Sequence, residues 1–100
     1  MQPFLVAKGW IFRDAQVSKK NKLIAKLRTD PRDFTWSEAV TLMRSCGFAL
    51  HHKKGSARMF VHLTKRVKLR LHEPHPQKTL LPYMVAQLLE GLRAAGEIDQ

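Results

Sequence analysis

The chain has 100 residues, of which 44% are hydrophobic and 26% charged, so it has the length and composition of one folded domain; two independent cores and an intrinsically disordered chain are excluded. It carries 18 Lys and Arg against 8 Asp and Glu, a formal net charge of +10 that favours a polyanionic partner and disfavours a neutral metabolic role. A single cysteine, Cys46, and the lack of any apolar run of membrane-spanning length favour a reducing compartment, the cytoplasm, with no membrane association.

The first 16 residues have neither helical nor alternating periodicity, so we expect a weakly determined N-terminal arm there and a single domain over residues 17–100. From Val17 to Arg28, apolar residues recur at helical spacing among lysines, which predicts a short amphipathic helix. Pro31 cannot continue that helix and is expected to end it.

The run Thr35-Trp36-Ser37-Glu38 is a capping box, in which the Thr and Glu side chains each bond to the backbone of the other residue. It predicts a second helix over residues 35–46, with an apolar stripe of Trp36, Ala39, Val40 and Met43. Gly47 stands where a helix commonly ends in a left-handed residue.

Three short segments with alternating character follow, and they predict a three-stranded antiparallel meander: Phe48 to His52, Ala57 to Leu63, and Val67 to His72. In the third segment, Val, Leu and Leu alternate with Lys68, Arg70 and His72, so one face should pack on the core and the other should be basic and exposed. The second segment is apolar on both faces, which leaves open whether Phe60 points into the core or forms a platform for base stacking.

The segment from Glu73 to Leu81 contains two prolines and is predicted to be a loop, after which Pro82 can begin a last helix that ends at Gly96. Its expected buried stripe is Val85, Leu88, Leu89 and Leu92. The order helix, helix, three strands, helix predicts an α+β fold in which the helices cover one face of the antiparallel sheet and leave the other face for a ligand.

Positive charge and histidine are concentrated together in the sequence. Residues 51–78 hold eight Lys and Arg, one carboxylate (Glu73) and all five histidines. Cations and hydroxyls in this stretch are candidates for binding RNA phosphates, namely Lys53, Lys54, Ser56, Arg58, Lys68 and Arg70. Imidazole exchanges protons near neutral pH, as RNA cleavage through the 2′-hydroxyl requires, so His72 and His75 are candidate catalytic groups, with Glu73 able to orient an imidazole.

Other readings of these residues are weaker. A basic strand face is often only a solvated surface. A metal site at His72 and His75 is disfavoured because the surrounding charge is positive, and no cofactor is expected. Cys46, beside Gly47 at the end of a helix, is expected to be a packed residue rather than a nucleophile.

Several short motifs together resemble the HicA family of mRNA interferase toxins, in its longer branch with an extra lysine-rich N-terminal helix. They are Asp33-Phe34-Thr35-Trp36-Ser37-Glu38-Ala39-Val40, Gly47-Phe48, Gly55-Ser56 with Phe60, Leu71-His72-Glu73-Pro74-His75-Pro76 and Leu81-Pro82-Tyr83. The resemblance covers residues 18–98, and its specificity lies in the order and spacing of the motifs. It implies a double-stranded-RNA-binding-domain-like fold, a metal-independent endoribonuclease of a type II toxin–antitoxin system, and neutralisation by a HicB-type antitoxin.

One position departs from the family pattern. The family's catalytic histidine usually follows the Gly-Ser pair, and here that place is taken by Ala57. We interpret the alanine as natural to the longer branch, which assigns proton transfer to His72 or His75. An inactive form, a non-catalytic RNA-binding module and a protein whose basic surface binds only a protein partner are the alternatives that Ala57 leaves open.

Overall fold

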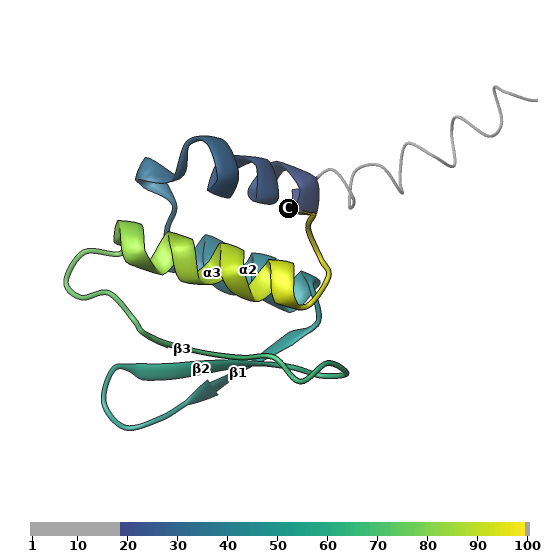
Figure 1. Cartoon of the computed structure of the whole chain (residues 1–100). Coiled ribbons are helices and arrows are strands. Elements are labelled where there is room, and N and C mark those ends of the chain that lie inside the picture. The colour runs from purple at the N-terminus through teal and green to yellow at the C-terminus, as the bar shows by residue number, and fades with distance from the viewer. Residues whose placement is uncertain (1–18, 100) are drawn as a thin grey trace, which may run out of the picture.

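The computed structural model describes residues 19–99, and the predicted N-terminal arm, residues 1–16, lies outside the described residues. The fold is α+β, as predicted: a three-stranded antiparallel sheet has the helices of the described residues on one side. Figure 1 shows three layers, in which α2 and α3 cover the sheet and the first helix lies on the outer side of that pair. Among the described helices, none combines the length and the apolar character needed to cross a bilayer.

The first helix spans residues 19–29 of the described chain and ends before Pro31, which begins the short 3₁₀ helix Pro31–Asp33. Leu27 is buried, and Leu23 and Ile24 pack beside it against the core. The Nζ atom of Lys26 lies 3.1 Å from a carboxylate oxygen of Glu38. This lysine therefore ties the outer helix to the layer below instead of only keeping it soluble.

Helix α2, Trp36–Ser45, begins at the predicted capping box. The Thr35 hydroxyl accepts a hydrogen bond of 3.0 Å from the backbone N–H of Glu38, and the Thr35 N–H donates to the Glu38 carboxylate at 3.0 Å. Burial raises the pKa of Glu38, but the hydrogen bonds from Thr35 and from Lys26 outweigh burial, so this pKa lies below its usual value. The helix ends at Ser45, and Gly47, just after the cap residue Cys46, has a φ of +90°, the expected left-handed conformation.

The strands are β1 (Phe48–His52), β2 (Ala57–His62) and β3 (Lys68–His72), with β2 in the centre. Phe60 pairs with Leu69 and is fully buried under the helices, where the centroid of its ring lies 5.7 Å from the ring centroid of Trp36. This decides the open question about β2: Phe60 belongs to the core and is not a stacking platform. The alternate residues Ala57, Met59 and Val61 therefore lie on the open face, where they are half-buried.

Helix α3, Pro82–Ala94, packs on β3 and supplies much of the core. Leu88 and Leu92 are fully buried and Val85 nearly so, as predicted, whereas Leu89 is only half-buried; Met84 and Gly91, which the predicted stripe left out, are buried. A Cβ atom at position 91 would lie 3.2 Å from Leu69, so glycine allows the helix to approach the strand closely.

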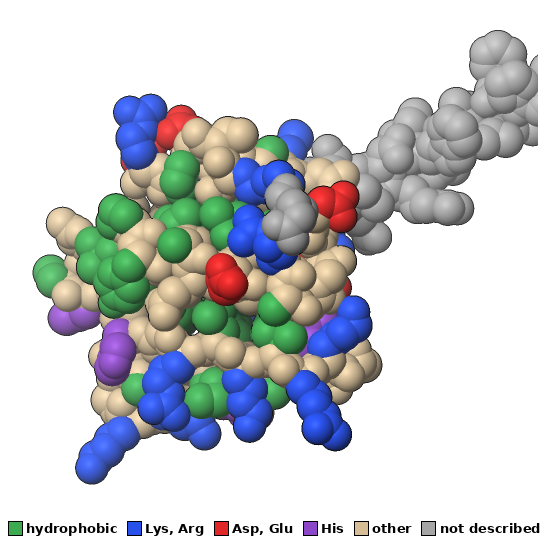
Figure 2. Space-filling view, in the orientation of Figure 1, with side chains coloured by type: hydrophobic (Ala, Val, Ile, Leu, Met, Phe, Trp, Pro, Cys, Tyr) green, Lys and Arg blue, Asp and Glu red, His purple; other side chains and the backbone are tan. Residues whose placement is uncertain are grey.

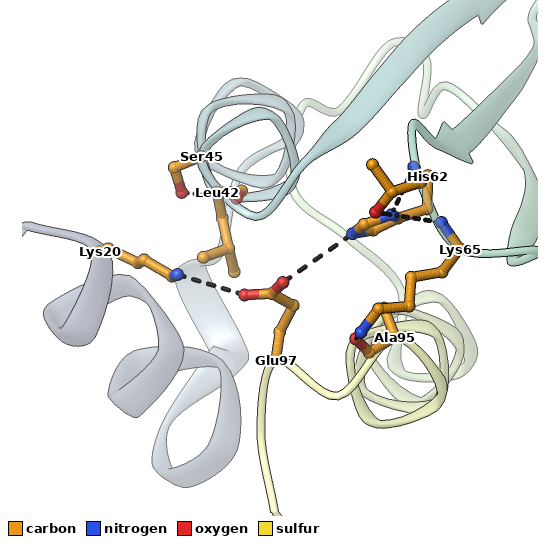
Figure 3. Close-up of polar contacts among 8 residues, drawn as sticks. Lys20, Leu42, Ser45, His62, Lys65, Ala95 and Glu97 are labelled. Atoms are coloured by element: carbon orange, nitrogen blue, oxygen red, sulfur yellow. Dashed lines mark hydrogen bonds and ion pairs between the residues drawn. The ribbon is translucent and has the colours of Figure 1, made fainter.

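Glu97, which follows α3, contacts both the first helix and the end of β2 (Figure 3). One carboxylate oxygen lies 3.2 Å from Lys20 of the first helix, and the other lies 3.8 Å from Nε2 of His62, at the end of β2. The backbone N–H groups of Thr64 and Lys65 donate to Nδ1 of His62 at 3.2 and 3.1 Å, which places the ring proton on Nε2, facing the carboxylate. His62 is buried, so this histidine has a structural role.

Candidate functional site

The open face of the sheet carries cations on its edge strand. Lys68 and Arg70 project from β3 beside the half-buried Met59 and Val61 of β2, because the register pairs Met59 with Arg70 and Val61 with Lys68. Figure 2 shows Lys and Arg side chains gathered along the sheet side of the molecule, with no acidic side chain among them in this view. This face can neutralise a chain of phosphates without any specific contact to a base.

The turn between β1 and β2 extends this positive surface at one end of the sheet. Lys53 and Lys54 are both exposed, and the backbone N–H of Lys53 donates to the carbonyl of Ala57 at 2.9 Å. The structure therefore brings Lys53, Lys54, Lys68 and Arg70 to the open side of the molecule. Each retains an exposed side chain that can reach an anion.

Arg58 lies apart from these cations. It pairs with Leu71, so its side chain lies on the helix side of the sheet, and only 14% of that side chain is exposed. The guanidinium lies 2.9 Å from Glu73 and donates to the carbonyls of Gly55 and Ala57 at 2.8 and 2.9 Å. Most of its donors are thus occupied, and the arginine holds the β1–β2 turn against the loop that follows β3.

Ser56 and His72 form a hydrogen-bonded pair on the open side. The serine Oγ lies 3.2 Å from Nδ1 of His72, and both residues are exposed. His72 stands directly opposite Ala57 in the antiparallel ladder. Side chains at such paired positions have Cβ atoms only about 5 Å apart. The His72 imidazole therefore lies within reach of the space that a side chain at position 57 would occupy.

The loop from Glu73 to Leu80 is anchored at both ends. At its start, the Glu73 N–H donates to the carbonyl of Ser56 at 2.9 Å. At its end, the carbonyl of Lys78 accepts a hydrogen bond of 2.7 Å from the Trp36 N–H, and the Leu80 N–H donates one of 2.8 Å to the carbonyl of Phe34. The loop thus bridges the β1–β2 turn and the beginning of α2, and it holds His75 between them.

Three hollows share this loop as a wall, and His75 lines all of them. The first, which we call the His72 hollow, has a volume of about 350 Å³ and is also lined by His72. The second, of about 520 Å³, lies beside Trp36 and Lys78 at the start of α2. The third, of about 330 Å³, lies beside Ser56 and Arg58. Two histidines therefore line one hollow next to the basic surface.

The expectation that Glu73 orients an imidazole does not agree with the contacts in the structure. Its carboxylate pairs with Arg58, and the group that contacts the His72 imidazole is the Ser56 hydroxyl. Of the other histidines, His51 and His52 are exposed on β1. Cys46 is buried, and burial raises the pKa of its thiol, so it is a packed residue as predicted.

Comparison with known proteins gives one match. Residues 36–96 match the sequence model of the family described as HicA toxin of bacterial toxin-antitoxin systems. The matched segment begins at α2 and includes the whole sheet, the anchored loop and α3. No curated protein and no solved structure matches the chain.

Proposed function

Because the chain belongs to the HicA toxin family of bacterial toxin–antitoxin systems, we propose that it is the RNA-cleaving toxin of such a system: a metal-independent endoribonuclease acting on mRNA. The observation that carries the proposal is the Ser56–His72 pair, which borders the basic open face and whose histidine lines one hollow together with His75. Phosphate binding and proton transfer are thereby available at the same place on the surface.

RNA binding is assigned to the exposed cations. Lys68 and Arg70 on β3, with Lys53 and Lys54 in the β1–β2 turn, contact successive phosphates of a single strand. Ser56 lies at the junction between these cations and His72. Arg58 serves the same site indirectly, because its ion pair with Glu73 fixes the loop that carries His75.

The cleavage step needs only a base and an acid. His72 removes the proton from a ribose 2′-hydroxyl, whose oxygen forms a bond to the adjacent phosphorus. The bond from phosphorus to the 5′-oxygen breaks, and His75 gives that oxygen a proton. The products are a 2′,3′-cyclic phosphate and a free 5′-hydroxyl, so no water or other co-reactant is consumed.

Ser56 suits His72 to this role. For Nε2 of His72 to take a proton from the substrate, Nδ1 must carry the other ring proton, and the Ser56 oxygen can accept a hydrogen bond from that N–H both before and after the transfer. The position of His72 opposite Ala57 supports the same assignment. An imidazole on the neighbouring strand replaces the one that the family usually carries at position 57.

The proposed protein partner is a HicB-type antitoxin. The net charge is +10, and residues 51–78, which hold most of the sheet and the loop, carry eight Lys and Arg against one carboxylate, which favours a partner with an acidic contact surface. Such a partner would neutralise the toxin by covering the cations that RNA needs.

A direct test is cleavage of a single-stranded oligoribonucleotide in the presence of EDTA. We expect fragments that end in 2′,3′-cyclic phosphate and begin with a 5′-hydroxyl, because the attacking group is the substrate's own 2′-oxygen. A matched oligonucleotide with 2′-deoxyribose at the cut position should stay intact. RNA that remains uncut at every site would contradict the endonuclease assignment and leave a non-catalytic RNA-binding module, with which Ala57 is also compatible.

RNA affinity should fall steeply with salt, because each neutralised phosphate releases counterions. For single strands, log K changes with log salt by about −0.7 per phosphate contact, so replacing both Lys68 and Arg70 by Ala should make the slope shallower by about 1.4. The matched control is the double variant Lys22→Ala/Arg28→Ala, which makes the same change in net charge on the exposed first helix. If the slope became shallower by the same amount in both double variants, only the total charge would matter, and the assignment of phosphate binding to Lys68 and Arg70 would be wrong.

A further inference from the structure

The lining of the His72 hollow combines two chemical types of residue. His72, the last residue of β3, and His75 of the anchored loop are polar, and Leu81 and Met84, at the beginning of α3, are apolar. Gln77 and Thr79 add an amide and a hydroxyl, and Glu73, Pro74 and Pro76 complete the lining. Leu81 is 46% exposed, so a large aliphatic side chain borders the hollow on its solvent side.

This combination matches the chemistry of an unpaired nucleobase. A base has flat apolar faces and a polar edge, and proteins that read single-stranded RNA bury the faces on apolar side chains and bond the edge with polar groups. An apolar side chain from a protein partner would fit the hollow less well, because it would leave the amide, the hydroxyl and the imidazoles without partners. The volume of about 350 Å³ lies within the range of small-ligand sites.

The open face of the sheet has a different character. Lys68 and Arg70 of β3 are exposed beside half-buried aliphatic side chains of β2, His51 of β1 lies on the same face opposite Met59, and Phe60 lies on the other side of the sheet. The cations of that face suit it to holding phosphates. A strand that follows the cations to His72 meets the hollow at the end of β3.

We propose that the His72 hollow binds one unpaired nucleobase of the RNA, from a nucleotide next to the phosphodiester at His72, and that Gln77 determines which base is preferred. The proposal rests on the proposed RNA substrate and adds to it a source of sequence preference. Leu81 and Met84 contact the face of the base, and the Gln77 amide bonds its edge. A side-chain amide pairs well with adenine, which offers an adjacent donor and acceptor, so adenine is the expected preference.

The first experiment measures binding of nucleoside 5′-monophosphates to the full chain by NMR, with ribose 5-phosphate as the probe that lacks a base. We expect AMP to shift the amide signals of Gln77, Thr79 and Met84, and ribose 5-phosphate to bind at least about tenfold more weakly at these residues. Equal shifts from both probes would mean that only the phosphate is recognised, and would overturn the proposal.

Two charge-matched variants locate the site. Leu81→Glu places a carboxylate among the apolar residues of the lining and should weaken AMP binding about tenfold, whereas Leu63→Glu, at an exposed leucine outside the hollow, should not change it. Both positions are exposed enough to tolerate the change. Equal weakening by the two variants would overturn the proposal.

Cleavage of a mixed-sequence RNA separates this inference from the proposed function. Gln77→Ala should change which bases flank the cut sites while RNA is still cut. If RNA is cut with an unchanged preference in Gln77→Ala and Leu81→Glu, the base site is wrong and the nuclease remains. If AMP binds as expected and RNA stays intact, the base site stands and the nuclease assignment fails.

Discussion

We expect His72→Ala to slow RNA cleavage by about 100-fold or more while RNA affinity changes little, because the variant loses the base and keeps the cations. The same loss is expected for His75→Ala if the second imidazole acts as the acid. The measurement is the single-turnover rate at saturating RNA, with affinity measured separately on a substrate that carries a 2′-deoxyribose at the cut position.

His51→Ala is the matched control, because His51 is an exposed histidine on β1, at the opposite edge of the sheet from β3. Its rate should equal that of the unmodified chain. Rates that stay unchanged in both His72→Ala and His75→Ala would contradict the assignment. If the unmodified chain binds RNA without cutting it and Ala57→His confers cleavage, the site is the family's usual position and the chain is an inactive form.

Leu88→Ala should lower the free energy of unfolding by about 2–5 kcal/mol, because Leu88 is fully buried between α3 and the sheet and its loss leaves a cavity. A small domain is stable by only about 5–15 kcal/mol, so this is a large fraction of the total. The change should appear as a lower midpoint in urea denaturation with a similar slope. Leu63→Ala, which truncates a leucine that is 74% exposed, should leave the midpoint almost unchanged. Equal midpoints for the two variants would mean that α3 does not pack as described.

The parts of the fold that could be predicted are those whose causes are local in the chain. The start of α2 depends on Thr35 and Glu38, three residues apart, and its end depends on the positive φ of Gly47. The basic face of β3 follows from strict alternation. The faces of β2 could not be assigned, because the strand is central and apolar on both sides, so only its neighbours decide that Phe60 points inward.

Most of the candidate site's geometry depends on contacts between distant residues. Ser56 and His72 are 16 residues apart, and no local pattern indicates that a hairpin serine will meet this imidazole. In the sequence, Arg58 cannot be distinguished from the other cations of the basic stretch. Only the register of the sheet shows that its side chain lies on the helix side, where it pairs with Glu73. His62 could not be separated from the other histidines, because its partner Glu97 lies 35 residues further along the chain.

The Glu97 cluster and the anchored loop lie at opposite ends of both α2 and β2. The cluster involves His62, at the end of β2, and this ring packs beside Gly47 at the end of α2; the loop meets the beginning of the same two elements. The contacts that hold the layers together thus lie at one end of the molecule, and the candidate site lies at the other. Substitutions in the Glu97 cluster should alter the fraction of the protein that is folded, whereas substitutions in the anchored loop should alter the activity of the folded protein. Residues of the anchored loop can therefore vary without weakening the Glu97 cluster, which holds the layers of the molecule together.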